Sequence, residues 1–355
     1  MAERVTRPIR YNLLSQRSGL LHRPLKEAAI PLLEIYMIVG FLLAAYSVVA
    51  NDSIQTLGTF LASNSHRPWW LLWMFAGSIL LLVLFYGWVA NDGDPAYGRL
   101  EKFPVPEGGV SWIHAIPPLA LLILTRLGVP VSTTFLVLTV FAVTGGETSN
   151  LNAMLTKSAL GYLVAFVSAI LLFSFVFKRA TEFFHRTRGE EIPRYWVVLQ
   201  WASTGFLWSQ WLIQDLANIF VYLPRELSPL WLMFGVGALL AMQGYIFYQF
   251  GGEIQKIVLT KTDTTDIRAA TIIDFIYGVV LLIFKEMSNM PMSTTWVFLG
   301  VLAGREFALS FYLADTTTRG TARKVISDVL KALSGLVVSV VLAFGLPWLH
   351  GLFFD

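Results

Sequence analysis

Two copies of a hydroxyl-rich motif each open an apolar stretch of the sequence. Both copies follow the pattern apolar-Pro-apolar-Ser-Thr-Thr, and their hydroxyl residues are Ser132, Thr133, Thr134, Ser293, Thr294 and Thr295. Proline suits the first turn of a helix, where unpaired N–H groups and the positive end of the helix dipole attract anions. Two such helix starts facing each other would hold a tetrahedral oxyanion. For either copy by itself, the alternative is a plain helix cap.

Each motif is preceded by a carboxylate that has side-chain amides nearby. The two groups consist of Asn51, Asp52 and Gln55, and of Gln214, Asp215 and Asn218. Ionised carboxylates within a bilayer are costly and usually functional, and carboxylate and amide oxygens suit a hard cation such as Na⁺. We therefore predict a Na⁺ site in which Asp52 and Asp215 are the charged ligands. For Asp52, the alternative is the solvated end of the first apolar helix.

The two pairs of motifs have nearly the same spacing. Asp52 lies 80 residues before Ser132 (132 − 52), and Asp215 lies 78 residues before Ser293 (293 − 215). Motifs that recur in one order at one spacing predict an internal repeat. The apolar stretches divide five and five around one charged segment. The two halves are therefore expected to run in opposite directions, as in the inverted repeats of secondary transporters.

The composition is that of an integral membrane protein. Of 355 residues, 55% are apolar and 14% are charged, whereas soluble domains are about a quarter charged. The predicted fold class is all-α integral membrane, with about ten membrane segments. The expected parts are a basic N-terminal tail over 1–29, a first repeat over 30–177, a charged linker over 178–194 and a second repeat over 195–350. Short apolar stretches meet at 127–130 and at 287–291, where paired re-entrant hairpins are expected.

Several functional classes are excluded or disfavoured. The chain has no Cys, and its five His residues are scattered, so thiolate chemistry is excluded and no metal-ligand spacing is present. No dense basic block indicates a nucleic-acid partner. We expect neither an enzyme nor a cofactor, apart from a coupling ion. An intramembrane enzyme with Asp52 and Asp215 as acid and base is the alternative, and the duplicated anion motifs argue against it.

Other charges within apolar stretches are interpreted mainly as structural. Arg305 and Glu306 follow Ser293 by about three helical turns, and they would form an internal pair or line the pathway. Three further charged residues are expected to be paired or to reach the membrane surface, namely Glu34, Asp274 and Lys331. The distribution of Lys and Arg favours a cytoplasmic linker. The expected location is the cell (inner) membrane, which the chain would cross several times.

The motifs resemble those of the inorganic phosphate transporter (PiT) family. That family carries Gly-Ala-Asn-Asp-x-Ala-Asn and Gly-x-Pro-Val-Ser-Thr-Thr-His in each half. Residues 128–134 match the second motif through its final Thr, and residues 289–295 match it more loosely. Residues 50–52 and 215–218 match parts of the first motif. The order and spacing extend the resemblance over about 30–349.

The resemblance implies a cation-coupled importer that is often dimeric. In that family the Ser-Thr-Thr tips hold phosphate and the Asn-Asp motifs hold Na⁺. We expect a secondary active transporter that imports inorganic phosphate with Na⁺ or H⁺ by alternating access. The family His is replaced here by Phe135 and by Trp296, and Asn by Gln55 and by Gln214.

These departures leave the substrate open between phosphate and sulfate or another oxyanion. Phosphate at neutral pH keeps a proton that a carboxylate can accept, whereas sulfate has none. Two nearby carboxylates therefore favour phosphate, unless cations occupy both. A non-transporting membrane scaffold or receptor is the remaining alternative.

Overall fold

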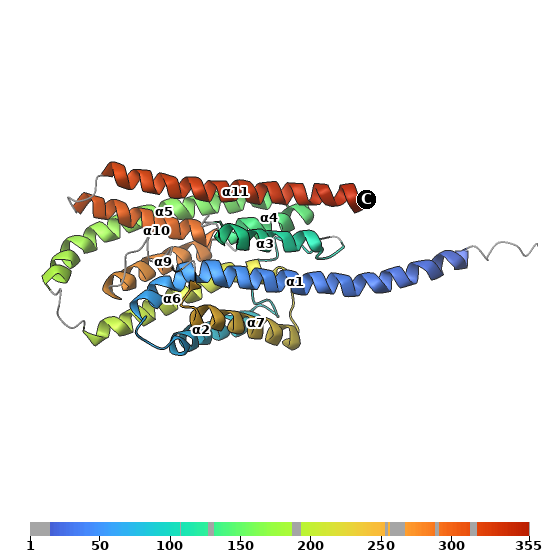
Figure 1. Ribbon diagram of the computed structural model, residues 1–355, viewed down its shortest axis with the longest axis horizontal. Helices are drawn as coiled ribbons and strands as arrows, with labels where there is room; N and C mark the ends of the chain where they lie inside the picture. Colours follow the sequence, from blue (N-terminus) through green and yellow to red (C-terminus); the bar gives the residue numbers. More distant parts are fainter. Residues whose placement is uncertain are drawn as a thin grey trace, which may run out of the picture.

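The computed structural model describes residues 15–106, 108–126, 131–186, 193–252, 255, 267–287, 291–312 and 318–354. These residues form helices and connections without a strand, which confirms the predicted all-α fold (Figure 1). The first half contains α1 (Ser15–Ser63), α2 (Trp69–Ala90), α3 (Trp112–Arg126), α4 (Thr133–Thr144) and α5 (Ser149–Arg186). The second half contains α6 (Arg194–Phe220), α7 (Pro229–Tyr248), α9 (Ile267–Met287), α10 (Thr294–Tyr312) and α11 (Thr318–Phe354).

Within the described part of the chain, five helices are long and apolar enough to cross a bilayer. Their apolar parts are Glu34–Ser63, Trp69–Ala90, Ser149–Leu171, Pro229–Tyr248 and Gly320–Leu352. Large apolar side chains on several of them face outward, and Leu82 is 71% exposed and Leu230 80% exposed. Apolar surface of this kind suits contact with lipid. By contrast, α6 is buried along its second half and carries polar residues there, so it runs through the interior of the bundle.

Helix α1 is longer than the sequence suggested. It continues through residues 51–55 to Ser63, and Asp52 is only 2% exposed. The alternative in which Asp52 marks the solvated end of the first helix is therefore wrong. The helix also begins within the expected tail 1–29, at Ser15, and residues 1–14 lie outside the described part.

The charged linker is also partly helical, because α5 continues to Arg186. Only residues 187–192 of the linker 178–194 lie outside the described part. The limits of the expected tail, linker and repeats are not fixed by these helix ends, and they stay a prediction.

Two helices near the expected hairpin of the first half are short. Helix α3 has 15 residues and α4 has 12, so α4 is about 18 Å long at ~1.5 Å per residue, less than the ~30 Å of a bilayer core. The two helices contact each other, as the arms of a hairpin would. The turns at 127–130 and 288–290 lie outside the described residues, so the re-entrant path stays a prediction.

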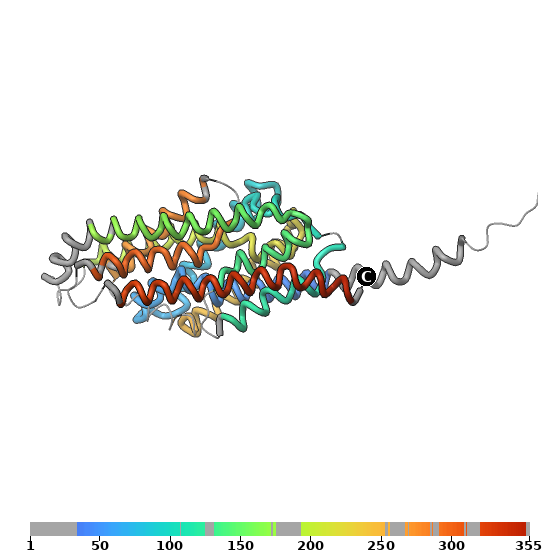
Figure 2. The backbone as a smooth tube through the Cα atoms, turned by 90° about the horizontal axis from the view of Figure 1, so that it is seen from above, coloured from blue at the N-terminus to red at the C-terminus, as the bar shows by residue number. Residues whose placement is uncertain are grey.

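Helix contacts in one half have counterparts in the other. Contacts of α1 with α3 correspond to those of α6 with α9, and contacts of α5 with α10 correspond to those of α11 with α4. Helices α1 and α6 are antiparallel. Asn64 Nδ2 donates to Gln200 Oε1 over 2.8 Å at one end of the pair, and Gly40 packs against the Tyr222 ring at the other. Figure 2 shows the same bundle from above. Such contacts are expected of an inverted repeat, which stays a prediction.

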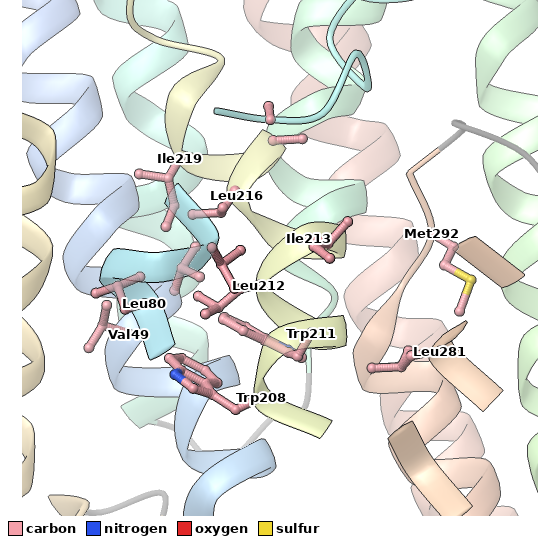
Figure 3. Close-up of a cluster of buried hydrophobic side chains, with 14 of the residues drawn as sticks. Val49, Leu80, Trp208, Trp211, Leu212, Ile213, Leu216, Ile219, Leu281 and Met292 are labelled. Carbon is pink, nitrogen blue, oxygen red and sulfur yellow. The ribbon is translucent and has the colours of Figure 1, made fainter. Parts of the chain in front are cut away.

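The interior around α6 is filled by large apolar side chains (Figure 3). Trp208 and Trp211 stack with ring centroids 4.9 Å apart, and Trp208 Nε1 donates to the carbonyl of Ala76 in α2 over 2.9 Å. Val49 of α1 and Leu80 of α2 lie in the same cluster. This packing fixes α6, and it thereby fixes the polar residues in the following turns of that helix.

Two glycines bring α10 into backbone contact with α5. A Cβ atom on Gly300 would lie 2.4 Å from the Tyr162 carbonyl oxygen, and one on Gly304 would lie 2.3 Å from the Phe166 carbonyl oxygen. Residues four apart share a helix face, and small residues at this spacing permit close packing of membrane helices. The contact holds the middle of α10 beside α5.

Candidate functional site

Asp52 lies within α1, 11 residues before the last residue of the helix (63 − 52), and faces the starts of two other helices. Its Oδ1 accepts a hydrogen bond from Asn51 Nδ2 over 2.6 Å. Its Oδ2 accepts one from the hydroxyl of Thr133, the first residue of α4. The hydroxyl of Thr295, in the first turn of α10, also stabilises the charge of this carboxylate. Asp52 therefore joins α1 to the starts of both α4 and α10.

Asp215 occupies the corresponding position in α6. Its Oδ2 accepts from the Thr294 hydroxyl over 2.7 Å, and its Oδ1 accepts from Asn218 Nδ2 over 2.6 Å. The Thr134 hydroxyl lies 3.4 Å from Asp215 Oδ1 and 3.1 Å from the Met292 carbonyl oxygen, so two acceptors share its single proton. Asp215 also joins its own helix to the starts of both α4 and α10.

The threonine contacts are crosswise between the two halves. Thr133 and Thr294 donate to the carboxylate of their own half, whereas Thr134 and Thr295 reach the carboxylate of the opposite half. We call this cluster the paired-aspartate site; it consists of Asn51, Asp52, Thr133, Thr134, Asp215, Asn218, Thr294 and Thr295. Each member is at most 3% exposed. The structure thus brings together eight of the twelve predicted ligands, and their role in binding stays a prediction.

The two serines of the motifs cap their own helices. Ser132 Oγ accepts from the backbone N–H of Phe135 over 3.3 Å, and Ser293 Oγ accepts from that of Trp296 over 3.2 Å. The backbone N–H of Ser293 donates to Ser158 Oγ in α5 over 2.9 Å. The alternative in which the motif forms a plain helix cap therefore applies to the side-chain oxygens of these two serines. A capping oxygen still has its own O–H proton, which can be donated to a ligand.

The two glutamines lie at the margin of the site. Gln55 Nε2 is 3.4 Å from Asn51 Oδ1, and Gln214 Nε2 donates to the Leu281 carbonyl oxygen of α9 over 3.3 Å. Gln214 Oε1 and Asn218 Oδ1 are buried without a hydrogen-bond donor. A buried acceptor that lacks a donor costs about 1–3 kcal/mol, and an amide oxygen is a ligand that hard cations accept. Two such oxygens therefore flank Asp215.

The chemistry of the site is set by two carboxylates in an apolar interior. Asp52 and Asp215 are close enough to repel each other, and burial of a charge is costly unless it is paired. Among the described residues, no group of three His, Cys, Asp or Glu could hold a metal ion. A carboxylate that is accompanied by hydroxyl and amide oxygens is instead suited to binding Na⁺ or a proton. The starts of α4 and α10 direct their positive dipole ends to the same place.

Two aromatic rings stand at the positions where the family motif has His. Phe135 and Trp296 each follow the last threonine of their motif, and their ring centroids are 5.7 Å apart. Phe135 is 3% exposed. The two halves therefore make an apolar contact beside the paired-aspartate site.

A third buried carboxylate lies outside the predicted set. Asp274 of α9 is 1% exposed; its Oδ1 accepts from the Thr59 hydroxyl over 2.7 Å and its Oδ2 from the Thr204 hydroxyl over 2.5 Å. The prediction that Asp274 is paired with another charge or reaches the membrane surface is wrong, because two threonine hydroxyls bind its carboxylate inside the bundle. An acidic residue within an apolar stretch was the available signal, as for Asp215.

The other charged residues agree better with their structural interpretations. Arg305 Nη1 and Glu306 Oε1 pair at 3.0 Å on α10, as expected for an internal pair. Glu34 and Lys331 are exposed, as expected for side chains that reach the membrane surface.

Comparison with solved structures found a protein of similar fold. A solved structure described as the sodium-dependent phosphate transporter matches the chain with a TM-score of 0.57 and 17% sequence identity. The match covers 91% of this chain and 100% of that one. No family model matches the sequence, and no curated protein matches it. The chain is thus a multi-pass, all-helical membrane protein with a fold like that of a phosphate transporter.

Proposed function

We propose that the chain is a secondary active transporter that imports a tetrahedral inorganic oxyanion across the cell membrane. The observation that carries this proposal is the crosswise bonding of Asp52 and Asp215 to threonines at the starts of α4 and α10. One site is built equally from both halves of the chain. A site between two repeats of opposite direction is where secondary transporters bind their substrates.

Cation coupling follows from the charges of the site. Two carboxylates repel an incoming anion until cations or protons neutralise them. Na⁺ bound at Asp52 and Asp215, with Asn51, Asn218, Gln55 and Gln214 supplying amide oxygens, would remove that repulsion. The threonine hydroxyls could then rotate from the carboxylates to the anion. Binding of each ion thereby favours binding of the other, which is the physical basis of symport.

Phosphate is the proposed substrate, and sulfate is the second candidate. A protonated phosphate can donate a hydrogen bond to Asp52 or Asp215, whereas sulfate can only accept. The named substrate of the structurally similar transporter also supports phosphate. Transport by a homodimer embedded in the bilayer is part of the proposal.

Uptake of labelled phosphate into proteoliposomes tests the function. The rate should rise with an inward Na⁺ gradient or an inward H⁺ gradient, and excess unlabelled sulfate should leave it nearly unchanged. Thr133→Val combined with Thr294→Val keeps the side-chain shapes and removes one hydroxyl from each half. This variant should lower uptake by about tenfold or more, since a hydrogen bond to a charged group contributes ~1.5–3 kcal/mol.

Thr139→Val is the matched control, because the Thr139 hydroxyl donates to the Phe135 carbonyl within α4 and not to a carboxylate. It should transport like the unmodified protein. Sulfate uptake without phosphate uptake would identify sulfate, and not phosphate, as the substrate. Binding of either anion by folded protein without net uptake would favour the scaffold or receptor instead.

A further inference from the structure

Arg99 is a buried cation that the paired-aspartate site does not include. It lies in the connection between α2 and α3, and its side chain enters the protein so far that the residue is 1% exposed. Its Nε and Nη1 atoms are buried without a hydrogen-bond acceptor. A guanidinium has five N–H donors and remains charged in proteins. Leaving such donors unpaired in the interior costs free energy.

The charge of Arg99 acts on the paired-aspartate site. Asp215 is the acidic group that stabilises the Arg99 charge, and Arg99 in turn stabilises the negative charge of Asp215. No hydrogen bond joins the two side chains. Arg99 also repels Lys157 of α5, whose neighbour Ser158 accepts from the N–H of Ser293. The guanidinium is thus within electrostatic reach of both Asp215 and the helix beside the start of α10.

Burial lowers the pKa of Arg99 from 12.5 to about 10. At neutral pH the guanidinium is therefore still charged. Its positive charge is available to a ligand throughout the physiological range.

Arg225 shows what a structural arginine looks like in the same region. Its Nη1 donates to the Val221 carbonyl over 2.8 Å, and its Nη2 donates to the Phe103 carbonyl over 2.7 Å. These bonds fasten the end of α6 to the α2–α3 connection. Arg99, in the same connection, is more deeply buried than Arg225 and has no such bonds from Nε or Nη1.

We propose that Arg99 binds the transported anion directly, as a positively charged ligand on the α2–α3 side of the paired-aspartate site. The ligand class is a doubly charged tetrahedral oxyanion, because a guanidinium donates two parallel hydrogen bonds to such a group. The inference rests on the proposed function and adds a ligand to it. Arg99 offsets repulsion between the anion and Asp215, and it favours a dianion over a singly charged anion.

The test compares Arg99→Gln and Arg99→Lys with the unmodified protein, with Lys102→Gln as the control. Lys102 lies in the same connection and is exposed, so its replacement removes an equal charge away from the site. Two quantities are measured for inorganic phosphate: KM and kcat of uptake into proteoliposomes, and Kd by calorimetry in detergent. Arg99→Gln should raise both KM and Kd by about tenfold to a hundredfold, with kcat changing less. Arg99→Lys should recover part of the affinity, and Lys102→Gln should change neither constant by more than about twofold.

Folding is checked by thermal unfolding without phosphate, where Arg99→Gln should be at least as stable as the unmodified protein because it removes an unpaired buried charge. Unchanged KM and Kd in Arg99→Gln, or a fall in kcat alone, would overturn the role of Arg99. Absence of uptake by the unmodified protein would overturn the proposed function instead. In that case the calorimetric Kd still decides whether Arg99 binds the anion.

Discussion

Asn218 Nδ2 in α6 donates a hydrogen bond to Thr134 Oγ1 in α4 over 3.1 Å. This bond joins the second half of the chain to the first beside Asp215. Because the same Asn218 nitrogen also donates to Asp215 Oδ1, the positions of the hydroxyl and the carboxylate depend on each other. A ligand that draws the Thr134 hydroxyl away would change the surroundings of Asp215 as well.

Neutralising either aspartate should stabilise the protein in the absence of ligands. Asp52→Asn and Asp215→Asn remove a buried charge and the repulsion between the two carboxylates, while an amide oxygen remains to accept from a threonine. Each variant should raise Tm by a few degrees in detergent without Na⁺ or phosphate, since about 1 kcal/mol corresponds to ~2–4 °C in a chain of this order of size.

The double variant Asp52→Asn with Asp215→Asn should gain less than the sum of the single variants, because either change alone already removes their mutual repulsion. Thermal unfolding followed by circular dichroism measures the three values. A lower Tm in both single variants would show that the negative charges stabilise the fold.

The contact between α5 and α10 should be sensitive to a single added methyl group. Gly300→Ala and Gly304→Ala would each bring a Cβ atom to within 2.4 Å of a carbonyl oxygen of α5, so the helices must separate. We expect each variant to lose about 1–3 kcal/mol of stability, visible as a lower Tm.

Gly237→Ala in α7 and Gly345→Ala in α11 are the controls, because nothing lies within 4 Å of a Cβ atom at either position. Both should unfold close to the temperature of the unmodified protein. Equal Tm values for all four variants would mean that α5 and α10 are not in backbone contact.

Tyr222 compensates for a proline in α3. Pro118 has no N–H group, so it cannot donate to the carbonyl of His114 four residues earlier. The Tyr222 hydroxyl donates to that carbonyl over 2.7 Å. Tyr222→Phe should therefore destabilise the protein by about 1–2 kcal/mol.

The KM for anion uptake should be unchanged in Tyr222→Phe, because this bond lies outside the paired-aspartate site. Chemical unfolding and transport assays on one preparation separate the two effects. A large rise in KM with unchanged stability would assign Tyr222 a role in binding.

Asp274 should tolerate loss of its charge better than loss of its polarity. In Asp274→Asn the amide can accept from one of Thr59 and Thr204 and donate to the other. Its Tm should equal or exceed that of the unmodified protein. Asp274→Leu leaves both threonines without their acceptor and should lower the Tm. The opposite order of the two values would show that the negative charge itself is needed for folding.

The sequence predicted the helical fold and the residues that meet at the site. Apolar stretches are long enough to identify helices, and the matched spacing of Asp52–Ser132 and Asp215–Ser293 indicated that the motifs belong together. It did not predict that α1 continues through Asp52, because the polar residues there are accommodated by partners from α4 and α10. Such partners are visible only in the folded chain.

Two further features depended on tertiary contacts. The burial of Arg99 results from the path of the α2–α3 connection, which hydropathy along the sequence does not describe. The spacing of Gly300 and Gly304 was visible in the sequence as a pair of small residues four apart, and it is a known packing signal in membrane helices. Its partner helix could not be identified without the structure.

The central claim is that Asp215 and its partners in both halves form one cation-coupled anion site. The most direct measurement is the initial rate of labelled phosphate uptake into proteoliposomes under an inward Na⁺ gradient, for the unmodified protein and for Asp215→Asn. We predict gradient-dependent uptake by the unmodified protein, and uptake no greater than that of protein-free liposomes by the variant, although the variant is folded. Equal gradient-driven uptake by both proteins would contradict the account.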